Sequence, residues 1–385
     1  MATYRSIVGL KIKKRSSDPS NPVLGEMWYN TTSGTLKVRG FGSASWSSGA
    51  TAPGPYMTFA GCGTQSAYIK TMGNDGSPAP NPLSNESQEY NGTSWTGVPN
   101  SPYSSRDPGQ GGVQTAAIFF GGQGPSIVST SISYDGSSFS GIPSMSNIRR
   151  SCNGTGSSSA TITVGGAGPA GGSPEGVMTN VEHYNGSAWA EESTTPYAVA
   201  SGGSGGVETA CLMVGGVSPG PEGPEAGVFT TLEYDGSSWT AGGAMGHGRT
   251  DGQACGTLTA GLAVGGRDSN PPPSAIPAAD TVEHYDGTSW TAGGAYPIAM
   301  NGTGIAGTQT AALACGGNTG GNIAASNTYD GSSFSSSATL NTGRGYISGC
   351  GTQAAGLFAG GGVPPYQQTE EYTLGSVGVV TIDTD

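Results

Sequence analysis

Histidine is the first residue type to consider for metal or acid–base chemistry, and this chain of 385 residues has three histidines. His183 and His284 stand at the same place in two copies of Val-Glu-His-Tyr, while His247 stands alone. A copper centre needs a histidine pair with further ligands nearby, and no such set can be assembled here. Because one motif carries both, His183 and His284 are interpreted as structural. The sequence predicts no metal site and no cofactor.

The glutamates that accompany these histidines are interpreted in the same way. Glu182, Glu233, Glu283 and Glu371 are expected to occupy equivalent places in a repeated strand. A glycosidase needs two convergent carboxylates, and a sialidase needs an arginine cluster as well. The basic residues of 41–385 are scattered along the chain. We therefore expect a protein that is not an enzyme.

The cysteines show neither zinc-like nor redox spacing, since no Cys-x-x-Cys occurs among the six. Cys62, Cys255 and Cys350 each precede Gly-Thr. A cysteine in such a repeated place acts as a small apolar residue in a crowded strand. We expect free, buried thiols.

The elements that position these residues follow from a fixed spacing of aromatic residues. Seven times, an aromatic residue stands 27 positions before the second residue of a Gly-Gly-like pair. The pairs are Trp46 and Gly73, Trp95 and Gly122, Phe139 and Gly166, Trp189 and Gly216, Trp239 and Gly266, Trp290 and Gly317, and Phe334 and Gly361. A fixed frame with one segment of variable length is typical of propeller blades. The sequence predicts an all-β fold, a seven-bladed β-propeller over residues 41–385.

One repeat shows how a blade is expected to be built. Residues 252–257 suit an inner strand, 258–266 an apolar second strand and 280–285 a third strand, and Asp286-Gly287 predicts a type I′ turn into the outer strand. The long Pro/Gly-rich insertions all lie between the second and third strands, at 74–89, 167–183, 217–233 and 267–284. Because variable loops carry function, the face with these insertions is the expected binding face.

Closure of the ring has two interpretations. Trp46 keeps the common spacing, which favours a strand near residues 42–48 as the outer strand of the last blade. The competing interpretation gives that place to the tail, residues 375–383.

The repeat resembles the kelch repeat in its Gly-Gly, its tyrosine before a turn and its aromatic residue beyond the turn. Arginines ten or eleven positions after the aromatic complete the likeness; they are Arg106, Arg150, Arg249 and Arg344. The resemblance implies a kelch-like propeller, and it implies little about activity because propellers host many functions.

Residues 1–40 are expected to form a short β arm with a net charge opposite to that of the propeller. They carry seven of the chain's 14 basic residues, and the whole chain has a net charge of −12. Ile7, Leu10 and Ile12 alternate with polar residues, as in a strand added to a partner's sheet. We expect virion anchoring by the basic residues Lys11, Lys13, Lys14 and Arg15. Nucleic acid is not expected as a partner, because an acidic body repels phosphates.

The hairpin Gly-Glu-Met-Trp-Tyr-Asn-Thr-Thr-x-Gly-x-Leu-Lys-Val, at 25–38, resembles one near the start of bacteriophage tail-fibre proteins. Together with the repeats, it is similar to kelch-like structural proteins of marine tailed phages. The resemblance implies a virion component, made and assembled in the host bacterial cytoplasm, whose arm contacts other virion proteins. Fibre proteins imply a homotrimer, whereas a single propeller has no required partner. No apolar stretch is long enough for membrane insertion.

These expectations combine into a non-enzymatic tail fibre or surface appendage that recognises a host cell-surface receptor or glycan through its loop face. The candidate ligand-binding residues are Tyr56, Tyr103, Tyr197, Tyr296, Glu175, Glu222, Glu225 and Asp268. Tyrosine rings stack on sugars and carboxylates accept hydroxyl hydrogen bonds, although each tyrosine also suits packing between blades. One alternative is a capsid decoration or adaptor protein with a stabilising role; a second is a polysaccharide-degrading enzyme.

Overall fold

The computed structural model describes residues 12–20, 26–41, 44–54, 57–74, 83–169, 176–216, 229–250, 252–268, 278–361, 367–375 and 377–382. The chain forms two compact units. The smaller unit joins Met1–Ser45 to Thr373–Asp385, and the larger one is Trp46–Tyr372. The sequence predicted a boundary after residue 40 and placed residues 41–385 in the propeller. The structure instead groups Thr373–Asp385 with the N-terminal segment.

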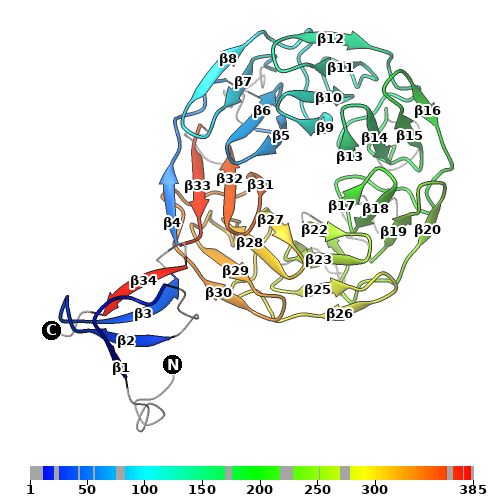
Figure 1. The fold of residues 1–385 in the computed structure, drawn as a ribbon. Helices are drawn as coiled ribbons and strands as arrows, with labels where there is room; N and C mark the ends of the chain where they lie inside the picture. Colours follow the sequence, from blue (N-terminus) through cyan, green and yellow to red (C-terminus); the bar gives the residue numbers. More distant parts are fainter. Residues whose placement is uncertain are drawn as a thin grey trace. The chain divides into compact units, whose positions relative to one another are not determined.

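The described residues form strands and no helix, in eight four-stranded sheets with a propeller-like arrangement (Figure 1). One of these sheets belongs to the smaller unit, and the others surround the axis of the larger unit. The part of the chain that the structure describes holds no helix with the length and apolar character needed to span a bilayer.

Each sheet of the larger unit runs outward from the axis in four antiparallel strands. The inner strands are β5 (Ala60–Thr64), β9 (Gly109–Val113), β13 (Asn153–Ser157), β17 (Gly203–Val207), β22 (Gln253–Thr257), β27 (Gly304–Thr308) and β31 (Ser348–Gly351). The second strands are β6 (Ala67–Thr71), β10 (Ala116–Phe120), β14 (Ala160–Val164), β18 (Ala210–Val214), β23 (Ala260–Val264), β28 (Ala311–Cys315) and β32 (Ala355–Ala359).

The third strands are β7 (Ser87–Tyr90), β11 (Ser131–Tyr134), β15 (Val181–Tyr184), β19 (Thr231–Tyr234), β25 (Val282–Tyr285), β29 (Ser326–Tyr329) and β33 (Thr369–Thr373). The outer strands are β8 (Trp95–Val98), β12 (Phe139–Ile142), β16 (Trp189–Glu191), β20 (Trp239–Ala241), β26 (Trp290–Ala292), β30 (Phe334–Ser336) and β4 (Ser45–Ser48). A short two-stranded sheet pairs β21 (Arg249–Thr250), directly before β22, with β24 (Arg267–Asp268), directly after β23.

The hydrophobic core lies between neighbouring sheets. One cluster joins Ile162 of β14 to Met213 of β18 and Leu232 of β19, all buried. The repeated aromatic residues cross the same boundaries, because the indole N–H of Trp95 donates to Thr369 Oγ1 (2.9 Å) and that of Trp290 to Thr231 Oγ1 (2.7 Å). The constant spacing in the sequence therefore keeps each outer strand in contact with the preceding sheet.

The last sheet is closed by the N-terminal segment. Its strand order is β31-β32-β33-β4, so Ser45–Ser48 supplies the outer strand. Trp46 packs on Tyr372 and Phe358, with ring centroids 5.2 and 5.5 Å apart, and donates to the Ala338 carbonyl at 2.8 Å. The interpretation based on the Trp46 spacing is confirmed.

The tail forms part of the other unit. There β1 (Lys13–Arg15), β2 (Met27–Asn30), β3 (Thr35–Phe41) and β34 (Val377–Ile382) make one sheet in that order. The β2–β3 hairpin agrees with its sequence pattern. Asp18 organises this sheet by accepting bonds from Trp28 Nε1 (3.0 Å), Asn30 Nδ2 (2.7 Å) and Lys37 Nζ (2.7 Å). The same bonds lower the pKa of Asp18 to about 2.

The turn between the third and outer strands differs from the expected two-residue type I′ turn. Tyr285 pairs with Trp290, which leaves a four-residue loop, and Gly287 alone within it has a positive φ, 96°. The Asp286 carboxylate accepts the backbone N–H groups of Thr288 (2.9 Å) and Ser289 (2.8 Å). A type I′ turn requires two successive residues with a positive φ. This loop needs only one, because the bonds to the Asp286 carboxylate stabilise it. Asn91 Oδ1 accepts the corresponding two N–H groups, which accounts for Asn or Asp at this place.

The buried arginines differ in part from the expected ones. Arg149, Arg249 and Arg344 are buried, each paired with a third-strand glutamate. Arg149 Nη2 donates to Glu182 Oε1 at 2.7 Å, and its Nη1 donates to the Gly165 carbonyl at 2.8 Å. Of the expected residues, Arg106 instead donates to Gln123 Oε1 at 3.1 Å. The buried arginine is thus always the one ten residues after the aromatic, and eleven was the wrong spacing.

The six cysteines are free, as expected. Cys211 and Cys315 are buried, whereas the three in inner strands, Cys62, Cys255 and Cys350, are only half-buried. Desolvation raises the pKa of the Cys62 and Cys255 thiols to about 12. The thiols are therefore protonated at neutral pH and are poor nucleophiles.

Candidate functional site: the axial pocket

The chain makes a repeated sharp turn where it enters each inner strand. The residue twelve positions after each repeated aromatic has a positive φ wherever the structure describes it. These residues are Thr58 (φ 50°), Asp107 (54°), Ser151 (52°), Ser201 (55°), Gly302 (62°) and Tyr346 (55°). All but Gly302 bear a side chain, and a left-handed backbone costs such residues about 1–2 kcal/mol. The fold imposes this conformation around the axis.

Backbone hydrogen bonds link these turn residues from one sheet to the next. Asp107 N–H donates to the Thr58 carbonyl (3.0 Å), and Ser151 N–H donates to the Asp107 carbonyl (2.9 Å). Tyr346 N–H donates to the Gly302 carbonyl at 2.6 Å. The turns therefore form a hydrogen-bonded rim at the end of the axis where the inner strands begin.

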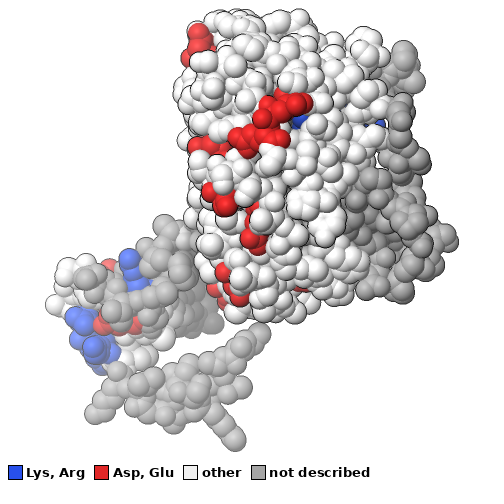
Figure 2. Space-filling view, turned by 90° about the vertical axis from the view of Figure 1, so that its right-hand side faces the viewer, with Lys and Arg blue, Asp and Glu red and all other residues white. Residues whose placement is uncertain are grey.

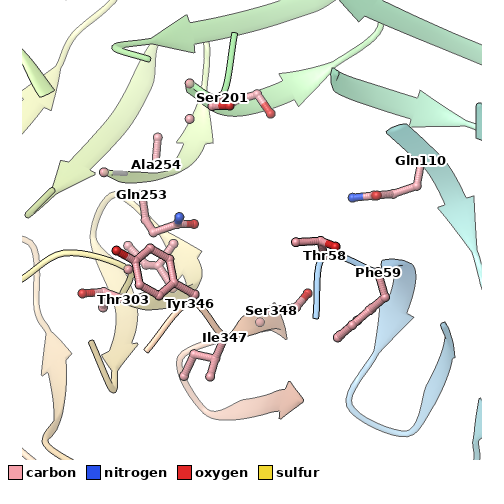
Figure 3. A pocket seen from close by; sticks show the side chains of 17 residues that line it. Thr58, Phe59, Gln110, Ser201, Gln253, Ala254, Thr303, Tyr346, Ile347 and Ser348 are labelled. Atoms are coloured by element: carbon pink, nitrogen blue, oxygen red, sulfur yellow. The ribbon is translucent and has the colours of Figure 1, made fainter. Parts of the chain in front are cut away.

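A pocket of about 570 Å³ lies within this rim, a volume inside the ~300–1,000 Å³ range of small-molecule sites. Residues from six sheets line it, and Figure 3 shows Gln110 reaching in from one side and Gln253 and Tyr346 from another. The side chains are hydroxyls, amides and a few apolar groups. Among the described lining residues, none is charged. The pocket opens on the face that carries the connections between second and third strands, because inner strands start at that face.

Small residues bring the inner strands close together below the rim. A Cβ on Gly203 would lie 2.6 Å from the Ala254 Cβ of the neighbouring sheet. A Cβ on Gly349 would lie 3.2 Å from the Ile305 carbonyl oxygen of the neighbouring sheet. Larger residues at either place would push the strands apart.

Tyr346 is the exposed aromatic residue of the rim, with 49% of its surface accessible. Its hydroxyl donates to Asn301 Oδ1 at 3.0 Å and accepts from Arg267 Nη2 at 3.3 Å. Its ring lies over Gly302, where an added Cβ would come within 3.0 Å of Tyr346 Cδ1. Both the hydroxyl and the ring are thus held in place without any ligand.

The tyrosines expected to bind a ligand do not gather at one place. Tyr296 is buried, donates to the Ala314 carbonyl (3.3 Å) and accepts from Asn327 Nδ2 (2.7 Å). Tyr103 packs on a core cluster, and burial raises its hydroxyl pKa. These two follow the alternative interpretation, packing between sheets. Tyr197 is 46% exposed but does not line the pocket.

Of the five other residues expected to bind a ligand, the structure describes only Asp268. Tyr56, Glu175, Glu222 and Glu225 lie outside the described residues. Asp268 lies in β24, where its backbone pairs with Arg249.

The basic residues expected to anchor the protein lie on one edge strand of the smaller unit. Lys13 and Arg15 of β1 approach Glu26 at 3.8 and 3.3 Å, while Lys14 is exposed. Lys11 lies outside the described residues. Of the residues expected to form a strand on a partner's sheet, Ile7 and Leu10 lie outside the described residues; β1 begins directly after Ile12 and pairs in parallel with β2. In Figure 2 basic residues lie on the smaller unit, and the charged residues on the visible side of the larger unit are mostly acidic.

Of the third-strand histidines, His284 contacts a neighbouring sheet, whereas His183 contacts Glu192, which follows the outer strand of its own sheet. His284 Nε2 bonds the Tyr329 hydroxyl, and His183 Nδ1 lies 3.2 Å from Glu192 Oε1. Within the described ranges, no three His, Cys, Asp or Glu residues could hold a metal ion. Glu233 and Glu371 occupy the position of the histidines and not that of Glu182, which corrects their expected equivalence.

Sequence reasoning missed Tyr346, Gln110 and Gln253. The signal was available, because Tyr346 is the one aromatic residue among the seven that stand twelve positions after the repeated aromatics. The conformation of that position was not visible in the sequence, since threonine, serine, aspartate and tyrosine all occupy it.

The fold and the pocket define an all-β, propeller-like protein with a polar axial cavity. A scan of protein-family models gives no match to this chain, and a search of curated proteins gives none either. Among solved structures, "Structure of YjhT" is similar, with a TM-score of 0.54 and 12% sequence identity over 73% of this chain and 96% of that one. At this identity the likeness shows the fold alone.

Proposed function

We propose that the protein is a non-enzymatic structural component of a tailed-phage virion, a tail fibre or comparable surface appendage, that recognises a host-surface glycan. The observation that carries the proposal is the pocket of about 570 Å³ on the loop face, whose described lining residues carry no charge. Its hydroxyl and amide groups suit hydrogen bonding to sugars. The phage assignment rests on the sequence resemblance of the N-terminal hairpin and the repeats.

We also propose that the larger unit is a seven-bladed kelch-like propeller. The sevenfold spacing of aromatic and Gly-Gly residues supports this count. The four-stranded sheets around the axis are compatible with it.

The smaller unit is the proposed attachment to other virion proteins. Among the described strands β1 is at the edge of its sheet, and Lys14 within it and Ile12 directly before it are exposed. A strand edge with basic side chains suits an acidic partner strand. Deleting residues 1–20 should leave the propeller folded and prevent incorporation into particles. Incorporation at the normal level would remove the anchoring role.

The test of the proposed function is competition for host cells. Purified protein should bind susceptible bacteria and slow phage adsorption, and antibody labelling should place it on the tail. Labelling of the capsid without any effect on adsorption would favour a decoration protein. Release of reducing sugar from host-surface polysaccharide would favour an enzyme.

A further inference from the structure

We propose that the axial pocket binds a neutral saccharide residue, with Tyr346 as the platform on which the sugar ring packs. This inference rests on the proposed function, because it names the glycan chemistry and its site. The proposed binding site is therefore the axial pocket with Tyr346, and not the tyrosines of the loops.

The lining of the pocket favours an uncharged, hydroxyl-rich ligand. Gln110 and Gln253 offer amides that both donate and accept, and Ser201, Thr303 and Ser348 add hydroxyls. A sugar hydroxyl also donates and accepts, so these groups pair with it in either direction. A buried carboxylate or phosphate needs a cation to offset its desolvation, and none of the described lining residues is one.

Arg267 is a charged residue hydrogen-bonded to Tyr346, and its position bears on whether the pocket suits an anion. Its Nη2 donates to the Tyr346 hydroxyl at 3.3 Å. The guanidinium therefore orients the phenol, and it is not among the residues that line the pocket. Arg267 is assigned a positioning role.

Tyr346 is the one aromatic residue described at a turn whose left-handed conformation the fold imposes around the axis. Its φ of 55° is unfavourable for a residue with a side chain, whereas Gly302 takes the same turn, with φ 62°, in the neighbouring sheet. The ring is half-exposed, so it buries little apolar surface in return. Three contacts nevertheless fix it: Asn301, Arg267 and the backbone of Gly302. A rigid, exposed aromatic ring at the edge of a polar pocket is suited to the apolar face of a sugar.

The experiment uses the full chain and a defined set of probes. These are neutral methyl hexosides, deoxyhexosides and N-acetylhexosaminides, with the matching uronic acids and sialic acid, studied by ligand-observed NMR. We expect at least one neutral glycoside to bind, with an affinity that is unchanged between 50 mM and 500 mM salt. Failure of every neutral glycoside at millimolar concentration, or tighter binding of an acidic sugar, overturns the proposal.

Substitution of Tyr346 separates binding from stability. Tyr346→Gly should bind at least tenfold more weakly while its melting temperature stays equal or rises, because glycine relieves the left-handed strain. Tyr346→Phe should keep the platform and lose less affinity. Tyr197→Ala, at an exposed tyrosine outside the pocket, is the matched control and should bind normally. Unchanged affinity in Tyr346→Gly contradicts the assignment.

Failure of this inference is distinguishable from failure of the proposed function. If Tyr346→Gly adsorbs to host cells as the natural protein does, recognition occurs elsewhere on the molecule and the proposed function stands. If the natural protein binds neutral glycosides but not host cells, the saccharide site is supported and the proposed host recognition is contradicted.

Discussion

Single residues within the repeats vary together, and one hydrogen bond explains the pattern. Seven residues after the repeated aromatic, the chain has either a proline or a residue with a backbone N–H. Where an N–H is present, it donates at 2.6 Å to a third-strand glutamate, in the pairs Ser146 with Glu182, Gly246 with Glu283, and Asn341 with Glu370. The prolines are Pro53, Pro102, Pro196 and Pro297, and the matching third-strand residues are Gln88, Ile132, Leu232 and Asn327. The third-strand glutamate and the arginine paired with it thus occur only in repeats where the residue seven positions after the aromatic has a backbone N–H that the glutamate can accept.

Replacing Glu182 alone should be strongly destabilising. Glu182→Leu leaves the fully buried Arg149 without its carboxylate, and losing one partner of a buried ion pair costs about 3–5 kcal/mol. The triple change Ser146→Pro, Arg149→Val and Glu182→Leu copies the apolar set Pro196, Val199 and Leu232, and should recover most of that loss. Urea denaturation measures both, with Glu208→Leu, at a half-buried glutamate outside these ion pairs, as control. A triple variant as unstable as Glu182→Leu would contradict the interpretation.

Lys70 should make stability rise with pH above neutrality. The side chain is buried, and burial lowers its pKa to about 7, against the attraction of Glu86. Between that pKa and the unfolded value near ~10.4, the unfolded chain holds the extra proton, so the free energy of unfolding increases with pH. Lys70→Met should remove this slope between pH 6.5 and 8.5 when the two proteins are compared by urea denaturation. Parallel curves for both would show that the lysine keeps its ordinary pKa, as its position 5.2 Å from the Trp95 ring centroid would favour.

Among the elements, strand β4 determines whether the ring has an open edge. A chain of residues 44–375 keeps β4, and a chain of 49–375 lacks it and leaves the outer edge of β33 without a partner strand. The shorter chain should melt at a lower temperature and associate as its concentration rises, since an exposed strand edge pairs with other chains. Calorimetry and light scattering test this, and Trp46→Ala in the full chain separates the loss of the ring contacts from the loss of the strand. Equal melting temperatures would mean that β4 is dispensable.

At the scale of the whole molecule, the two units should respond separately to loss of the tail. A chain ending at residue 375 lacks β34, which pairs with β3 over six residues. Hydrogen exchange should then lose protection in β2 and β3 and keep it in the inner strands of the propeller. Loss of protection throughout would show that the units fold as one.

The sequence revealed those parts of this fold that repeat. The position of β4 followed from Trp46, because one spacing applied to all seven copies. The pairing of β34 with β3 did not, since it occurs once and joins residues over three hundred positions apart. The pocket was missed for a related reason. Its residues come from six sheets, and the four of them at the rim share a left-handed backbone conformation that Thr, Ser, Gly and Tyr all adopt.

The chain passes between the two units twice, once after β3 and once after β33. Two units joined by a single segment of chain are separated by one break in that segment. Here two covalent connections run between the units, and the pairing of β34 with β3 and of β4 with β33 secures the chain on either side of them. A protease that nicks one connection leaves the units joined by the other. Tension applied between the units is likewise shared by two polypeptide segments. One segment carries the tension alone only after β34 or β4 has separated from its partner strand.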